Sequence, residues 1–129
     1  MSVFIVLITH EKMGADLLKV LHRTYGKLPN EIKAVSIDRN NAPEKWIAKV
    51  IEIIHKIRQH EDVLLLTDLY GSTPSNIAQA VKDRMTDRRV EVVSGVNLPM
   101  LLKIVNYYQL PLEQLTEKAI EGGKQGIVK

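Results

Sequence analysis

The feature that most constrains the fold of this chain is the alternation of short apolar runs with longer segments of helical repeat. Four runs have the length of a buried strand: residues 2–9, 31–38, 62–67 and 89–94. In the segments that follow them, apolar residues recur at the three- and four-residue spacing of an amphipathic helix. Such alternation predicts an open, mainly parallel sheet with helices on both faces. We therefore expect an α/β sandwich of three layers, with strand order 2-1-3-4, as one domain over residues 1–129.

The expected helices follow each strand, and two helices follow the last one. In the first, apolar residues recur at helical spacing (Leu17, Leu18, Leu21 and Tyr25), and Gly26 stands where the helix can end. The second opens at Pro43. The remaining helices are expected over residues 75–85, 98–108 and 112–121.

Composition argues against several classes of protein. There is no cysteine, so disulfides and thiolate metal sites are excluded. The net charge of +3 comes from dispersed basic residues, and the one tight basic pair, Arg88 and Arg89, lacks aromatic stacking partners, so no nucleic-acid binding is expected. The apolar residues 1–8 lack the basic start of a signal peptide and are too short to span a bilayer. We expect a cytoplasmic protein without membrane insertion.

Polar residues directly after the first and third strands point to a site. Ligands of such sheets bind beyond the carboxyl ends of the strands, where the winding direction switches. With strands one and three as neighbours, His10 and Asp68 meet there. A carboxylate that accepts a proton from one ring nitrogen leaves the other nitrogen free to attack. Alternatively, His10 only ends a strand and bonds nearby backbone.

The segment DLYGSTPSN, which starts at Asp68, has the pattern of a helix start. Thr73 is a good N-cap and Pro74 suits the first helical position. The N–H groups around Ser72, Thr73 and Ser75 would then be free to bind a phosphoryl group. A glycine before them, Gly71, permits a left-handed turn or a close backbone approach. Alternatively, the segment is a helix start and nothing more.

Other polar residues near the strand ends are weaker candidates. Thr9 and Asn97 are candidates for lining the same crevice, and Asn97 also looks like a helix cap. Glu11 is expected to be a solvated acid, with a role as a base as the alternative. Neither GxGxxG nor a Walker-type lysine loop is present, and the other histidines lack acidic partners at metal-ligand spacing. No metal or cofactor is expected.

Four blocks of sequence (ITH, DLYGSTPSN, SGVNLPMLL and EGGKQGIV) resemble the mannose-family enzyme IIA domains of the bacterial sugar phosphotransferase system. The resemblance spans nearly the whole chain. It implies a phosphotransferase whose first-strand histidine is phosphorylated by the phosphocarrier HPr and then donates to a IIB domain for sugar uptake. His10 matches the phosphorylated position and Asp68 its carboxylate partner. Ser72 and Thr73 match positions whose backbone amides hold the phosphoryl oxygens.

The chain departs from the family pattern at three places. Leu69 stands where several members have threonine, and Ser72 stands where glycine is frequent. The sequence ends at Lys129 without a linker or a fused IIB domain. We expect either an acceptor on a separate chain or a regulatory protein that binds partners according to its phosphorylation state. The resemblance assigns sugar choice to other subunits. A phosphoaspartate receiver is the other alternative, but it needs an acidic pair after strand one, where this chain has Thr9 and His10.

The resemblance also implies a homodimer in which an antiparallel C-terminal strand is exchanged. The tail GGKQGIVK is too rich in glycine to favour helix and ends in the apolar Ile127 and Val128. It predicts a hinge followed by a strand that pairs with a partner's open sheet edge. The alternative is a frayed terminus.

Overall fold

Four parallel strands form the centre of the protein in the described part of the chain. The structure is a computed structural model that describes residues 3–29, 31–57 and 61–129. The strands are β1 (Phe4–His10), β2 (Ile32–Ile37), β3 (Val63–Thr67) and β4 (Val90–Ser94). They lie in the order β2-β1-β3-β4, and each neighbouring pair is parallel. The predicted order is confirmed.

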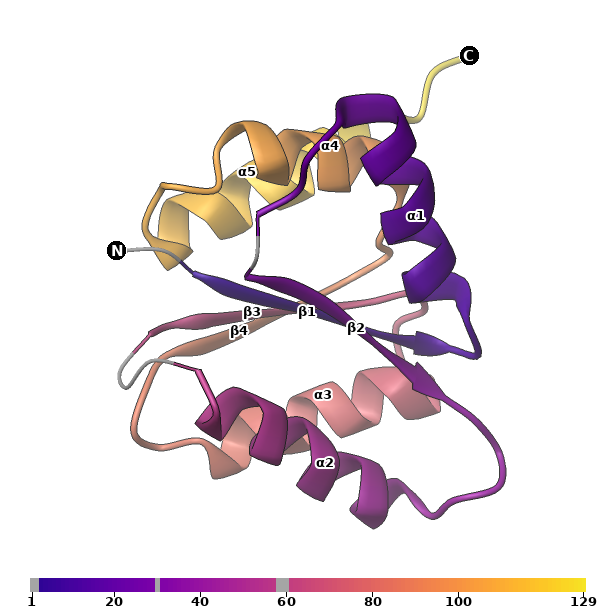
Figure 1. The fold of residues 1–129 in the computed structure, drawn as a ribbon, viewed down its shortest axis with the longest axis vertical. Helices are drawn as coiled ribbons and strands as arrows, with labels where there is room; N and C mark the ends of the chain where they lie inside the picture. Colours follow the sequence, from indigo (N-terminus) through magenta and orange to yellow (C-terminus); the bar gives the residue numbers. More distant parts are fainter. Residues whose placement is uncertain (1–2, 30, 58–60) are drawn as a thin grey trace.

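Helices cover both faces of this sheet and complete the predicted three layers (Figure 1). On one face lie α1 (Met13–Tyr25), α4 (Leu98–Asn106) and α5 (Leu112–Gln125); on the other lie α2 (Pro43–His55) and α3 (Thr73–Arg84). Side chains of β1 alternate between two cores: Val6 and Ile8 pack with α2 and α3, whereas Ile5 and Leu7 face the other helices. Of the helices described, none is both apolar enough and long enough to cross a membrane.

One local expectation on the helices is wrong. The helix expected over residues 75–85 begins earlier, so that Ser72, and not Thr73, is its N-cap residue. Ser72 has the extended backbone of an N-cap (φ −83°, ψ 174°).

The glycine-rich tail does not end the last helix, which is a correction to the sequence-based expectation. Helix α5 continues through Gly122 and Gly123 to Gln125. Close packing against α4 is the physical reason: a Cβ atom at Gly122 would lie 2.5 Å from the Cβ atom of Lys103. Gly126 likewise lies directly against Pro99, with no room for a side chain. These glycines therefore let two helices approach closely and do not act as a hinge.

The end of the chain leaves the body of the protein beyond α5 (Figure 1). Ile127 and Val128 are 80% and 82% exposed, and neither belongs to a strand of the described residues. The homodimer and the exchange of a C-terminal strand therefore stay predictions.

Candidate functional site

His10 and Asp68 lie side by side at the carboxyl edge of the sheet. His10 is the last residue of β1, and Asp68 directly follows the neighbouring strand β3. The ring Nδ1 of His10 lies 2.7 Å from Oδ2 of Asp68, and the main-chain N–H of His10 donates to the same oxygen at 3.0 Å. The predicted meeting of the two residues is confirmed. The histidine ring binds a carboxylate and not only nearby backbone.

The environment of this pair determines which ring nitrogen is available. The Asp68 side chain is 6% exposed, whereas that of His10 is 46% exposed. Burial raises the pKa of the Asp68 carboxyl, but hydrogen bonds from the His10 main chain and ring and from the main chain after Asp68 outweigh it and hold this pKa below its ordinary value. An ionised carboxylate only accepts hydrogen bonds, so Nδ1 of His10 carries the proton. Nε2 is the nitrogen with a free lone pair.

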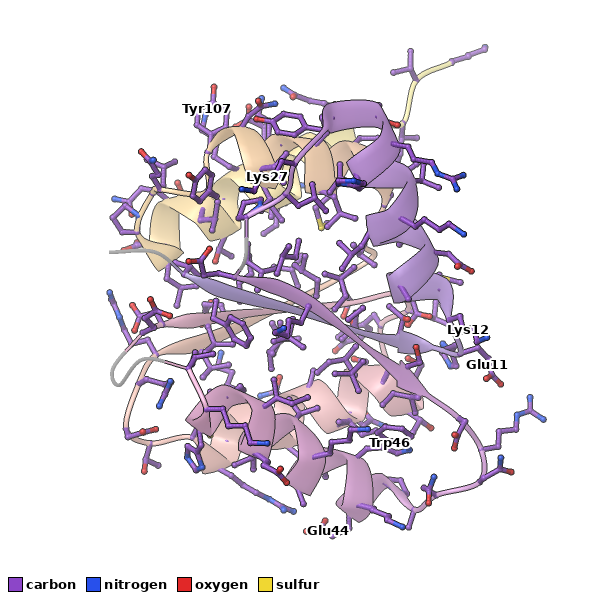
Figure 2. All side chains as sticks on the ribbon, viewed as in Figure 1. Glu11, Lys12, Lys27, Glu44, Trp46 and Tyr107 are labelled. Atoms are coloured by element: carbon purple, nitrogen blue, oxygen red, sulfur yellow. The ribbon has the colours of Figure 1, made fainter. Side chains whose placement is uncertain are left out.

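The turn after β1 is held in a backbone conformation that its sequence does not favour. Glu11 has a φ of 49°, in the left-handed region that is uncommon for residues other than glycine. Its N–H donates to the carbonyl oxygen of Ile37 at 2.9 Å. Figure 2 shows Glu11 and Lys12 at the end of β1. Sequence reasoning missed this strained turn, because a glutamate carries no signal for the left-handed region.

Thr9 stabilises the start of α1 and does not line the site. Its side chain is fully buried, and its Oγ1 accepts a hydrogen bond from the N–H of Gly14 at 2.7 Å. A Cβ atom at Gly14 would lie only 3.0 Å from this oxygen, so a side chain there would force Thr9 to shift. Thr9 and Gly14 therefore fix the loop that presents His10.

The start of α3 lies beside the histidine and is not capped by a side chain. The Ser72 hydroxyl turns back and donates to the carbonyl of Leu69 at 2.5 Å. The Ser72 N–H, expected to be free, donates to the same carbonyl at 3.3 Å. Within the residues described, the N–H groups of Thr73 and Ser75 have no hydrogen-bond acceptor. Two donors at the positive end of the helix dipole thus remain available.

Gly71 shapes the loop that precedes these donors. Its φ of 81° is in the left-handed region, as predicted from its position in the segment. Its N–H donates to Oγ of Ser75 at 3.3 Å. Gly71 therefore acts through backbone conformation, and its own N–H is already engaged inside the loop.

A hollow of about 560 Å³ opens next to His10. It is lined by His10, Glu11, Ile37, Asp38, Arg39, Asn41, Pro43 and Thr73. One of its walls is thus the loop between β2 and α2, which sequence reasoning did not assign to the site. The signal was present, because Asp38 and Arg39 directly follow a strand, as Asp68 does.

Asn97 has the capping role that its sequence position predicts. Its Oδ1 accepts a hydrogen bond from the N–H of Met100 at 2.8 Å, and its Nδ2 donates to the carbonyl of Gly123 at 3.2 Å. It is not among the residues that line the hollow. Its side chain ties α4 to α5.

The described residues contain no group of three or more histidine, cysteine, aspartate or glutamate side chains placed to hold a metal ion.

Comparisons of sequence relate the chain to known proteins. The family model described as "PTS system fructose IIA component" (EIIA-man) matches residues 4–120. The chain is 29% identical over 129 residues to the PTS system mannose-specific EIIAB component of Escherichia coli (strain K12), covering 98% of this chain and 39% of that protein. It is 30% identical over 77 residues to the PTS system fructose-specific EIIA component of Bacillus subtilis (strain 168), covering 60% of this chain and 51% of that one. The chain thus spans about two fifths of the length of the mannose-specific relative.

Solved structures share the fold. A phosphotransferase system component EIIA from Streptococcus agalactiae superposes with a TM-score of 0.87 at 24% identity, covering 98% of this chain and 96% of that one. A mannose/sorbose specific IIA subunit from Enterococcus faecalis has the same TM-score at 23% identity, covering 100% of this chain and 95% of that one. At these identities the likeness concerns the fold.

Proposed function

We propose that this chain, which belongs to the EIIA-man family of phosphotransferase-system IIA components, is a phosphocarrier that holds the phosphoryl group on His10. It accepts the group from phosphorylated HPr and passes it to a IIB domain for sugar uptake. The observation that carries the proposal is the 2.7 Å contact between Nδ1 of His10 and Oδ2 of Asp68.

In the accepting step, the lone pair of His10 Nε2 attacks phosphorus and forms a P–N bond. The P–N bond of the donor breaks, and its electron pair returns to the donor's imidazole nitrogen. His10 becomes a phosphoimidazolium with its Nδ1 proton in place, while the donor imidazolium becomes neutral, so that no net proton transfer is needed. Asp68 fixes the reactive tautomer and balances the positive charge of the ring.

The start of α3 supports the negative charge of the phosphoryl group. The free N–H groups of Thr73 and Ser75 are oriented donors at the positive end of a helix dipole. Such donors cost little reorganisation when charge develops on the oxygens. In the donating step the same groups act in reverse, with the acceptor on the IIB domain taking the phosphoryl group.

Labelling with phosphorylated HPr tests the proposal. The wild-type protein is expected to gain one phosphoryl group in an acid-labile, base-stable form, and His10→Ala is expected to gain none. His22→Ala, which removes an exposed histidine of α1, is the matched control and should be labelled like wild type. Normal labelling of His10→Ala would show that the assignment is wrong. A labelled protein that passes its group to no IIB domain would have a regulatory role instead.

A further inference from the structure

The loop between β2 and α2 forms part of the wall of the hollow, to which the start of α3 contributes Thr73. His10 pairs with Ile37 in the register of β1 and β2, so the chain after β2 runs beside the turn that follows His10. In this loop, Oδ1 of Asp38 accepts hydrogen bonds from the N–H of Asn40 at 3.0 Å and from Nδ2 of Asn41 at 3.4 Å. Arg39 therefore sits on a loop that is folded around its neighbour's carboxylate.

Arg39 stands apart from the other charged residues around the hollow. Among the lining residues it is the one lysine or arginine, and the acids there are Glu11 and Asp38. In the described part of the chain, its side chain forms no ion pair and no hydrogen bond. By contrast, Arg84 binds both oxygens of Glu44, at 2.6 and 3.1 Å (Glu44 is labelled in Figure 2). Arg39, whose guanidinium has no partner among the described residues, thus lines the same hollow as His10.

We infer that Arg39 binds the phosphoryl group carried by His10, together with the start of α3; this inference rests on the proposed function. A phosphoryl group on Nε2 brings negative charge into a hollow lined by two carboxylates, and a cation there offsets their repulsion. The planar guanidinium can bind two phosphoryl oxygens at once, which an ammonium cannot. During transfer the charge spreads over the equatorial oxygens, where such a donor stabilises it most. Arg39 and Thr73 would then both hold the group.

A small phosphoryl donor separates binding of the phosphoryl group from docking of a protein partner. With phosphoramidate, the lone pair of His10 Nε2 forms the new P–N bond, and ammonia leaves with the electron pair of the old one. Arg39→Gln is expected to slow labelling by phosphoramidate and by phosphorylated HPr alike, by about tenfold to a hundredfold. Arg39→Lys should fall in between. The control is Arg23→Gln, which removes an exposed cation from the last turn of α1 and should be labelled like wild type.

A second measurement reads the phosphorylated protein directly. The phosphorus NMR signal of the phosphohistidine should titrate at higher pH in Arg39→Gln than in wild type, because a nearby cation favours the dianion. Arg23→Gln should titrate like wild type. Unchanged phosphoramidate labelling and an unchanged titration in Arg39→Gln would overturn the inference, as would a loss confined to HPr, which would make Arg39 a docking residue. A failure of the proposed function is distinct, since the wild-type protein itself would then carry no label on His10.

Discussion

The starts of α3 and α4 look alike in sequence but differ in the folded protein. Each follows a neighbouring strand, and each has a polar N-cap residue and a proline in its first turn. At α4, the Asn97 side chain caps the N–H of Met100 at 2.8 Å. At α3, the Ser72 hydroxyl points back to Leu69 and leaves the equivalent N–H, that of Ser75, without an acceptor. An uncapped helix start forgoes about 1 kcal/mol of stability.

The difference shows which helix start has backbone N–H groups available to a ligand. At α4, the Asn97 side chain caps the first turn of the helix. The same side chain also binds Gly123 and so ties α4 to α5. Helix α3 keeps its first amides open next to the histidine that binds Asp68. A helix start that is left open beside a reactive side chain is a better indicator of a site than the start signal itself.

The largest effect on the rate of labelling is expected from Asp68, which binds His10 beside the uncapped start of α3. Asp68→Asn should keep the fold but slow labelling of His10 by at least about a hundredfold, because an amide can favour the wrong tautomer and cannot balance the ring charge. The rate of labelling by phosphorylated HPr measures this effect. Asp62→Asn, at the other end of β3, removes a carboxylate paired with Arg89 and should leave the rate unchanged. An unchanged rate in Asp68→Asn removes Asp68 from the mechanism.

A smaller effect is expected from capping the start of α3 with a side chain, as Asn97 caps α4. In Ser72→Asp the new carboxylate can accept from the N–H of Ser75, as Asn97 does from Met100, and it repels a phosphoryl group. Labelling should slow by about tenfold, while the free energy of unfolding rises by about 0.5 to 1 kcal/mol. Chemical denaturation measures the second quantity. Ser72→Ala is the control, expected to keep both donors and a near-normal rate; equal losses in the two variants would contradict the role of the amides.

Removing the cap of α4 should lower the stability of the fold and leave the rate of labelling unchanged. Asn97→Ala removes the cap on Met100 and the bond to Gly123, so the free energy of unfolding should fall by about 1 to 2 kcal/mol. Labelling at saturating donor should stay at the wild-type rate. If Asn97→Ala also slowed labelling, the assignment of the α4 start to stability and of the α3 start to phosphoryl binding would be wrong.

The smallest effect concerns the acid stability of the fold. A carboxyl whose pKa is lower in the folded chain stabilises the fold above its unfolded pKa, and this contribution is lost as the pH falls through the folded pKa. The pKa of Asp68 is held below its ordinary value, so wild type should exceed Asp68→Asn in stability at neutral pH. The difference should shrink below the ordinary pKa of an aspartate. Thermal unfolding of both proteins between neutral and acidic pH measures it, and a constant difference would contradict the pKa assignment.

The periodicity of the sequence by itself determined the architecture. Residues of β1 and β3 are buried on both faces, which requires the near-continuous apolar runs that identify them. Parallel order and right-handed crossovers then leave few topologies. That is why the pairing of His10 with Asp68 was predictable, since both stand at the carboxyl ends of strands that meet at the switch point.

Only the tertiary structure decided which local signals are used. Gly122 and Gly123 favour a helix end, yet the contact of α5 with α4 outweighs that preference and keeps them helical. Glu11 is held in the left-handed region by the bond between neighbouring strands. Arg39 borders the hollow because β2 pairs with β1. Each of these outcomes depends on contacts between segments that are distant in sequence, and such contacts are invisible to spacing and propensity alone.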